Sequence, residues 1–553
     1  MSDYYNLGPH TRTISTASPD AQLWFDRGLN WTYAFNHEEA VRCFEAAVAA
    51  DPNCALAHWG IAYAAGPNYN KPWEYFDEVD LAQTIARCHD VTQHALTLLD
   101  DASPAERALV EALAARYQSP APPGSVEDLV PWTDADAAAM RVVYRDYSAD
   151  LDIASLAAEA LMNRTPWRLW DQPTGQPVDG ADTLEAKEIL DRALQNPASR
   201  VHPGVLHMYI HLMEMSPAPE AALRPADFLR GLVPDGGHLQ HMSTHIDILC
   251  GHYHDVIEWN QRAMDVDETY FAHEGAMNLY TMYRVHNVHF KLYGAMFLGQ
   301  SDVALEAADR MIAMIPEDLL RVEIPPMAWW LEPFVPMKMH ALIRFGKWQE
   351  IIELTLPADQ QLYCVTTAMI HYAKSVAFAA TGRIAEAEDE QRLFDAAVSR
   401  VPEQYQFQNT PCRDIFALAG EMLAGELEYR RGNHAVAFDH LRKSVELEDN
   451  LPYAEPWAWM QPTRHALGAL LLEQGHVEEA EAVYRADLGL DDTLPRSCQH
   501  PENVWALHGY HECLVRLGKL DLATMIRQRL DLAVARADIP IEASCFCRMS
   551  QAA

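Results

Sequence analysis

The chain has 553 residues, of which 49% are hydrophobic and 22% are charged. These values are typical of a folded chain and exclude disordered, collagen-like and low-complexity classes. The formal net charge is −37, so the surface repels phosphate backbones and anionic membranes. We therefore expect no nucleic acid and no membrane as partners.

The start of the chain lacks the basic and apolar segments of a signal peptide, and no window approaches about 18 consecutive apolar residues. These features predict a cytoplasmic protein. Ten cysteines are scattered through the chain, which does not indicate a disulfide framework.

Apolar residues recur at three- and four-residue spacing, with Gly or Pro interrupting the pattern about every 15 to 20 residues. This spacing predicts an all-α protein. Two insertions are expected in the array: one is the loop and linker over 166–202, and the second covers 269–284. In chain order we expect an N-terminal arm (1–20), repeat-like helices (21–165), an insertion loop and linker (166–202), histidine-rich repeats (203–316), further repeats (317–536) and a non-helical tail (537–553).

A period of about 34 residues relates the helical segments. The first copy begins at Ala21 and carries Gly28, Ala40 and Phe44 at characteristic offsets. Further copies begin near residues 55, 203, 237, 285, 332, 368, 418, 461 and 504. Seven glycines share one offset, in the turn between two helices: Gly251, Gly299, Gly346, Gly382, Gly432, Gly475 and Gly518.

This pattern resembles the tetratricopeptide repeat (TPR) family over most of the chain. The resemblance implies an α-solenoid superhelix of about nine to eleven helix pairs, in which the first helix of each pair lines a concave groove. Several motifs, among them Phe35-Asn36-His37 and His286-Asn287-x-His289, also resemble those of a widespread bacterial and fungal group of TPR proteins. That second resemblance supports a shared site without naming a substrate.

Histidines are concentrated in one part of the chain, since residues 202–254 hold eight of the 25. Spacings of three and four place groups of them on single helix faces, and the TPR register implies that these faces line the groove. Imidazole and carboxylate are ligands for copper, iron, zinc or nickel. We therefore predict one or two transition-metal ions in the groove. The preferred ligands are His207, His211, His241 and His245, followed by Glu214, His286 and His289, and then by His238 near its helix start.

His202 precedes a proline and is expected outside this groove. The surplus of ligands also allows some histidines to orient others or to carry protons. The competing interpretation is a polar or pH-responsive groove that binds no metal.

The predicted function is a metal-dependent oxidoreductase that uses copper or iron to oxidise a small organic substrate. One alternative is a zinc hydrolase or lyase with Glu214 as the catalytic general base. Another is a non-catalytic scaffold that binds a protein or peptide. No nucleotide-binding or flavin motif is present, so we expect neither cofactor.

Four further residues are candidate substrate contacts, and another group is a candidate metal clip. Asn68 and Tyr69 follow a Gly-Pro turn, where an ordinary polar turn is the alternative. Arg464 suits a substrate carboxylate, and His465 lies beside it at a groove offset. His37 is expected either to cap a helix or to join the site. The candidate clip consists of Cys498, His500, Cys545 and Cys547, with packed or redox-active thiols as the alternative.

Overall fold

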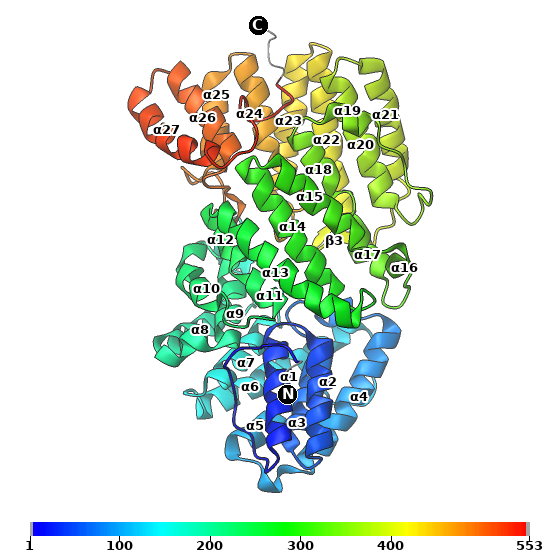
Figure 1. The fold of residues 1–553 in the computed structure, drawn as a ribbon, viewed down its shortest axis with the longest axis vertical. Helices are drawn as coiled ribbons and strands as arrows, with labels where there is room; N and C mark the ends of the chain where they lie inside the picture. Colours follow the sequence, from blue (N-terminus) through cyan, green and yellow to red (C-terminus); the bar gives the residue numbers. More distant parts are fainter. Residues whose placement is uncertain (1–3, 549–553) are drawn as a thin grey trace. The chain divides into compact units, whose positions relative to one another are not determined.

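The computed structural model describes residues 4–548, and its contacts divide the chain into two compact units (Figure 1). The first unit contains the chain up to residue 246 together with 262–284. The second contains 247–261 and the chain from residue 285 onward. Each unit is a stack of helices with almost no sheet.

The helices of the first unit are α1 (Pro19–Tyr33), α2 (His37–Ala50), α3 (Ala55–Ala65), α4 (Glu78–Leu96), α5 (Pro104–Leu113), α6 (Val130–Asp146), α7 (Leu151–Met162), α8 (Thr183–Gln195), α9 (Pro203–Glu214), α10 (Leu223–Leu229) and α11 (Gly237–Met242). Three helices contain the boundaries between units: α12 (Thr244–Cys250), α13 (Tyr253–Glu274) and α14 (Thr281–Leu298).

The helices of the second unit are α15 (Ser301–Ala313), α16 (Glu317–Leu320), α17 (Met327–Leu331), α18 (Met337–Arg344), α19 (Trp348–Ile352), α20 (Cys364–Ala380), α21 (Ile384–Val398), α22 (Cys412–Arg430), α23 (His434–Asp449), α24 (Thr463–Glu473), α25 (Val477–Asp487), α26 (Val504–Arg516) and α27 (Leu520–Val534).

Short 3-10 helices connect them: η1 (Trp73–Tyr75), η2 (Leu99–Asp101), η3 (Val126–Leu129), η4 (Pro197–Val201), η5 (Pro219–Ala222), η6 (Glu332–Phe334) and η7 (Arg496–Cys498). Two antiparallel hairpins pair β1 (Trp170–Asp171) with β2 (Gln176–Pro177) and β3 (Gln406–Phe407) with β4 (Thr410–Pro411). Trp170 pairs with Pro177 and Gln406 pairs with Pro411.

The seven glycines predicted to mark inter-helix turns all occupy such turns. Each lies between two consecutive helices and has a positive φ, from 61° at Gly346 to 83° at Gly432. A side chain would be strained in this conformation, whereas glycine adopts it freely. The shared position and conformation confirm the repeat register over residues 251–518.

The same packing arrangement recurs in both units. In the first, the Phe44 ring of α2 lies against Gly28 of α1 and Gly60 of α3, so closely that a Cβ on either glycine would come within 2.7 Å of the ring. In the second, Tyr484 of α25 lies against Gly468 of α24 and Gly509 of α26 in the same way. An aromatic ring seated between two glycines lets three successive helices stack closely. The fold is therefore an all-α TPR-type solenoid.

Two expected boundaries differ from the structure. The expected loop and linker over 166–202 contains the β1–β2 hairpin and also the helices α8 and η4. The expected insertion over 269–284 is much shorter, because α13 continues to Glu274 and α14 begins at Thr281. The tail beyond Arg536 contains no helix within the described residues. No helix over residues 4–548 is both long enough and apolar enough to cross a membrane.

Candidate metal centre

Three buried imidazoles converge in the first unit. His207 and His211 lie one turn apart on α9, and His238 lies on α11. All three side chains belong to residues no more than 1% exposed. Each offers one ring nitrogen to a group whose atoms lie within 4.8 Å of one another. Nitrogen atoms bound to one ion at 2.0–2.1 Å are at most about 4.2 Å apart, so the three rings could hold one ion after small side-chain rotations.

Hydrogen bonds leave the Nε2 atoms of the two α9 histidines available. His207 Nδ1 donates to the backbone carbonyl of Tyr33 at 2.7 Å, and His211 Nδ1 donates to Glu214 Oε1 at 2.8 Å. Because these partners accept hydrogen bonds, the proton of each neutral ring is on Nδ1, and Nε2 carries the lone pair. Neither Nε2 has a hydrogen-bond partner among the described residues, and both nitrogens of His238 also lack one. A ring held at one nitrogen and open at the other is the usual arrangement of a metal-binding histidine.

Burial keeps these rings neutral. It lowers the pKa of His207 to about 3 and the pKa values of His211 and His238 well below the ordinary value. The neighbouring imidazoles lower the pKa values of His211 and His238 further. At neutral pH the three rings therefore present lone pairs and no competing proton.

Aromatic rings enclose the three imidazoles. The Phe35 ring is stacked on His211 and His238, with interplanar angles of 10° and 17°, and its centroid lies 4.4 Å from that of His207. Tyr69 lies 5.0 Å from His211 on another side. Phe35 has a φ of 55°, a conformation that non-glycine residues rarely adopt. Residues with such backbone strain cluster at binding and active sites. Phe35 lies in the turn between α1 and α2, with its ring against the imidazoles.

Glu214 connects two groups of histidines. Its Oε1 accepts from His211 and its Oε2 accepts from His245 Nδ1 at 2.6 Å. His245 Nε2 in turn lies 2.6 Å from His241 Nε2, so a hydrogen bond joins these two rings. Both carboxylate oxygens are therefore engaged by imidazole nitrogens. Glu214 orients the rings in this structure, and His241 and His245 form a pair beside the three-histidine group.

The start of α9 depends on another histidine. His202 is the N-cap residue, and its Nδ1 accepts from the backbone N–H of Val205 at 3.2 Å, with a proline at the next position. Its Nε2 donates to Asp152 Oδ1 at 3.0 Å. His202 therefore positions the start of α9 and is not one of the three converging imidazoles.

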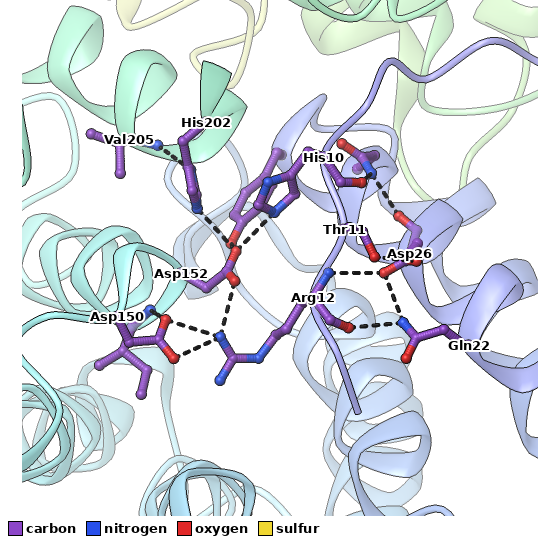
Figure 2. A network of polar contacts seen from close by, with 12 residues as sticks. His10, Thr11, Arg12, Gln22, Asp26, Asp150, Asp152, His202 and Val205 are labelled. Carbon is purple, nitrogen blue, oxygen red and sulfur yellow. Dashed lines mark hydrogen bonds and ion pairs between the residues drawn. The ribbon is translucent and has the colours of Figure 1, made fainter. Parts of the chain in front are cut away.

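Asp152 holds the N-terminal arm and the start of α9 together (Figure 2). Its Oδ1 also accepts from His10 Nε2 at 3.0 Å and from the Tyr33 hydroxyl at 2.6 Å, and its Oδ2 accepts from Arg12 at 2.9 Å. Burial by itself would raise the pKa of Asp152, but the hydrogen bonds from the histidines hold it well below its ordinary value. Tyr33 links this network to the candidate centre, since its carbonyl accepts from His207.

The candidates near the Gly-Pro turn have different roles. Asn68 Oδ1 accepts from the backbone N–H groups of Asn70 and Lys71 at 3.0 Å, which is a turn-forming role rather than a substrate contact. Tyr69 is fully buried and lies against His211. His37 does not cap α2, because the side chain of Asn36 does so.

Two predicted ligands, His286 and His289, belong to the second unit. There His286 Nδ1 lies 3.2 Å from Gln408 Nε2. His289 is buried in the core, with its Nε2 2.7 Å from the sulfur of Met460 and its ring against Phe334. Burial lowers the pKa of His289 to about 3. His289 therefore packs as a neutral core residue.

The remaining candidates of the second unit are committed to other contacts. Arg464 forms two hydrogen bonds with Asp449, at 2.5 and 2.7 Å, so its guanidinium is already paired. His465 and His500 both bond Asp487, each at 2.9 Å. The predicted metal clip is not formed: Cys545 and Cys547 are joined by a disulfide, and Cys498 is a separate buried thiol.

Sequence patterns did not identify Tyr33, Phe35 and Asp152 as parts of this arrangement. Tyr33 contributes a backbone atom as well as its hydroxyl, and no side-chain pattern indicates a carbonyl acceptor. Phe35 lies within a motif that marks the second resemblance, which was the available signal. Asp152 lies about 50 residues from His202 and becomes relevant only through the tertiary fold.

Comparisons with known proteins yield structural neighbours only. No family model and no curated protein match the chain. Among solved structures, the chain is similar to the APC/C hetero-tetramer Cut9–Hcn1, with 14% identity over 93% of this chain and 87% of that one and a TM-score of 0.28. It is also similar to yeast Tom70, with 11% identity over 92% and 99% and a TM-score of 0.26. The fold assignment rests on the helix pairs and turn glycines described above.

Proposed function

We propose that the chain is a metal-dependent enzyme whose first unit holds a transition-metal ion on His207, His211 and His238. The observation that carries this proposal is the convergence of three buried imidazoles, each of which has a ring nitrogen with no hydrogen-bond partner among residues 4–548. Each buried polar atom left unsatisfied costs about 1–3 kcal/mol. A single bound ion would satisfy one nitrogen of each ring, and the neutral state of the rings suits that role.

Three protein ligands leave at least one coordination position open, as in catalytic rather than structural metal sites. A copper or iron ion there would supply redox chemistry for the oxidation of a small organic substrate. The engagement of both Glu214 oxygens favours oxidation over a hydrolysis that uses Glu214 as general base. In this role Glu214 and the Tyr33 carbonyl fix the orientation of two ligands.

A zinc hydrolase or lyase is the second candidate. Three histidines are also a known ligand set of catalytic zinc. The metal itself therefore separates the two proposals.

The test is metal analysis of the purified chain by mass spectrometry, together with its optical spectrum. We expect about one copper or iron ion per chain, and loss of that ion in the His207→Ala/His238→Ala double variant. His440→Ala is the matched control, because His440 is a partly exposed histidine of the second unit that bonds Glu421. Circular dichroism establishes that each variant is folded. Stoichiometric zinc would support the second candidate, whereas no bound metal, or metal retained by the double variant, would contradict both and favour a scaffold.

A further inference from the structure

The second unit contains a cavity of about 40 Å³. One water molecule needs about 10–15 Å³ of such cavity volume, so the cavity has room for about three water molecules. Side chains of α18, α20, α22 and α24 line it together with residues of the tail. Its walls include Arg344, His340, Tyr372, Trp459, Glu426 and His465.

Arg344 provides a buried cation in this wall. It is 4% exposed, and its two terminal nitrogens donate to the Ser544 carbonyl at 2.9 Å and to His465 Nδ1 at 3.0 Å. Both partners are neutral, because burial lowers the pKa of His465 to about 4. Within residues 4–548, no carboxylate lies within ion-pair distance of Arg344, and the Asp487 carboxylate lies on the far side of the His465 ring, 2.9 Å from its Nε2. A buried cation without a direct counter-ion is costly.

Two further buried groups in the wall lack partners. His340 Nε2 and Trp459 Nε1 have no hydrogen-bond partner among the described residues. The two residues are 1% and 3% exposed, and their rings meet edge to face at 4.7 Å. Guanidinium and indole nitrogens can only donate hydrogen bonds. The wall of the cavity therefore includes hydrogen-bond donors and a positive charge.

The wall also contains one acid. Glu426 Oε1 accepts from Arg430 Nε at 2.8 Å, so this carboxylate is paired. Its presence disfavours a doubly charged ligand such as phosphate, whereas one guanidinium matches one carboxylate in charge and geometry. The aromatic rings of Tyr372 and Trp459 suit a short apolar group attached to that carboxylate.

We propose that this cavity binds a small organic monocarboxylate, with Arg344 as its counter-ion and with Trp459 and His340 as further hydrogen-bonding groups. Binding would provide the buried cation with a negative charge and the unsatisfied nitrogens with acceptor oxygens. This site is independent of the metal proposed for the first unit, so either proposal can fail without the other.

The test is isothermal titration calorimetry of the full chain with acetate, using acetamide as a neutral ligand of nearly the same shape. We expect saturable binding of acetate and at least about tenfold weaker binding of acetamide, because a guanidinium bonds a charged carboxylate more strongly than a neutral amide oxygen. Inorganic phosphate should bind more weakly than acetate. Equal binding of acetate and acetamide, tighter binding of phosphate, or no saturable binding at millimolar concentrations would overturn the proposal.

Variants locate the binding. Arg344→Gln should abolish it, and Trp459→Phe keeps an aromatic ring while removing the donor, so it should weaken acetate binding several-fold even if Arg344→Gln does not fold. Arg464→Gln is the matched control, because that arginine is paired with Asp449 and does not line the cavity. Acetate binding that is unchanged in Trp459→Phe, or lost equally in the folded control, would contradict the assignment.

Discussion

Replacing Glu214 with glutamine tests the role of this residue in orienting the proposed ligands. The carboxylate accepts one hydrogen bond at each oxygen, from His211 and from His245. A glutamine offers one acceptor and one donor, so one of the two Nδ1–H groups must lose its acceptor or its ring must change tautomer. Hydrogen bonds to a charged group contribute about 1.5–3 kcal/mol each.

We expect Glu214→Gln to weaken metal binding by about 10- to 100-fold, which corresponds to about 1.4–2.7 kcal/mol. The number of ions bound at saturation should stay the same, because His207, His211 and His238 remain. Affinity is measured by competition with a chromophoric chelator. Glu159→Gln is the control, since Glu159 is a buried acid of the same unit that accepts from Tyr63 at 2.6 Å.

Two results would refute this reasoning. An unchanged affinity would show that the hydrogen bonds that Glu214 accepts do not matter for metal binding. Complete loss of stoichiometric binding in a folded variant would show that Glu214 is itself an indispensable ligand.

Three other predictions concern packing, burial and charge. Phe35→Leu should weaken metal binding without abolishing it, because the Phe35 ring only encloses the imidazoles. Competition with a chelator measures the affinity, and an affinity equal to that of the native chain would contradict the prediction. Gly468→Ala should destabilise the chain by about 1–3 kcal/mol in urea unfolding, because the added Cβ would lie 2.4 Å from Tyr484. Gly420 has open space around it, so Gly420→Ala should instead stabilise α22 by about 0.5–1 kcal/mol. Burial raises the pKa of Glu448 from 4.5 to about 7, so the folded state keeps a proton that the unfolded state loses, and stability falls as pH rises through this window. Glu448→Gln should remove this pH dependence, so the stability of the variant relative to the native chain should rise by up to about 3 kcal/mol from pH 5 to pH 8 in urea unfolding. The same difference in unfolding free energy at both pH values would contradict the prediction.

The sequence was most informative where local geometry determines the outcome. A glycine at a fixed offset predicts a turn because the backbone conformation depends on that residue, and Gly251 to Gly518 confirm this. The helix α8 was not separated from the preceding loop, because its segment lacks the repeat's glycine and aromatic residues. The continuation of α13 to Glu274 is also not predicted from the sequence.

For the site, helical spacing placed His207 and His211 on one face, but it could not rank His238 above His241. That ranking depends on which nitrogens find hydrogen-bond partners in the folded chain. The sequence likewise indicates that Arg464 could contact a substrate carboxylate, but it does not indicate the partner of that arginine. Only the tertiary structure pairs Arg464 with Asp449 and leaves Arg344 without an acid beside it.

Tyr33 takes part in two interactions, one through its hydroxyl and one through its backbone carbonyl. Its hydroxyl donates to Asp152, which also bonds His10 and Arg12 of the N-terminal arm, and its carbonyl accepts from the ring of His207. Thermodynamic coupling is reciprocal, so an ion on that ring should tighten the arm by the same free energy with which the docked arm strengthens ion binding. A bulky affinity tag fused at the N-terminus would then give preparations with less bound metal than the same tag placed at the C-terminus.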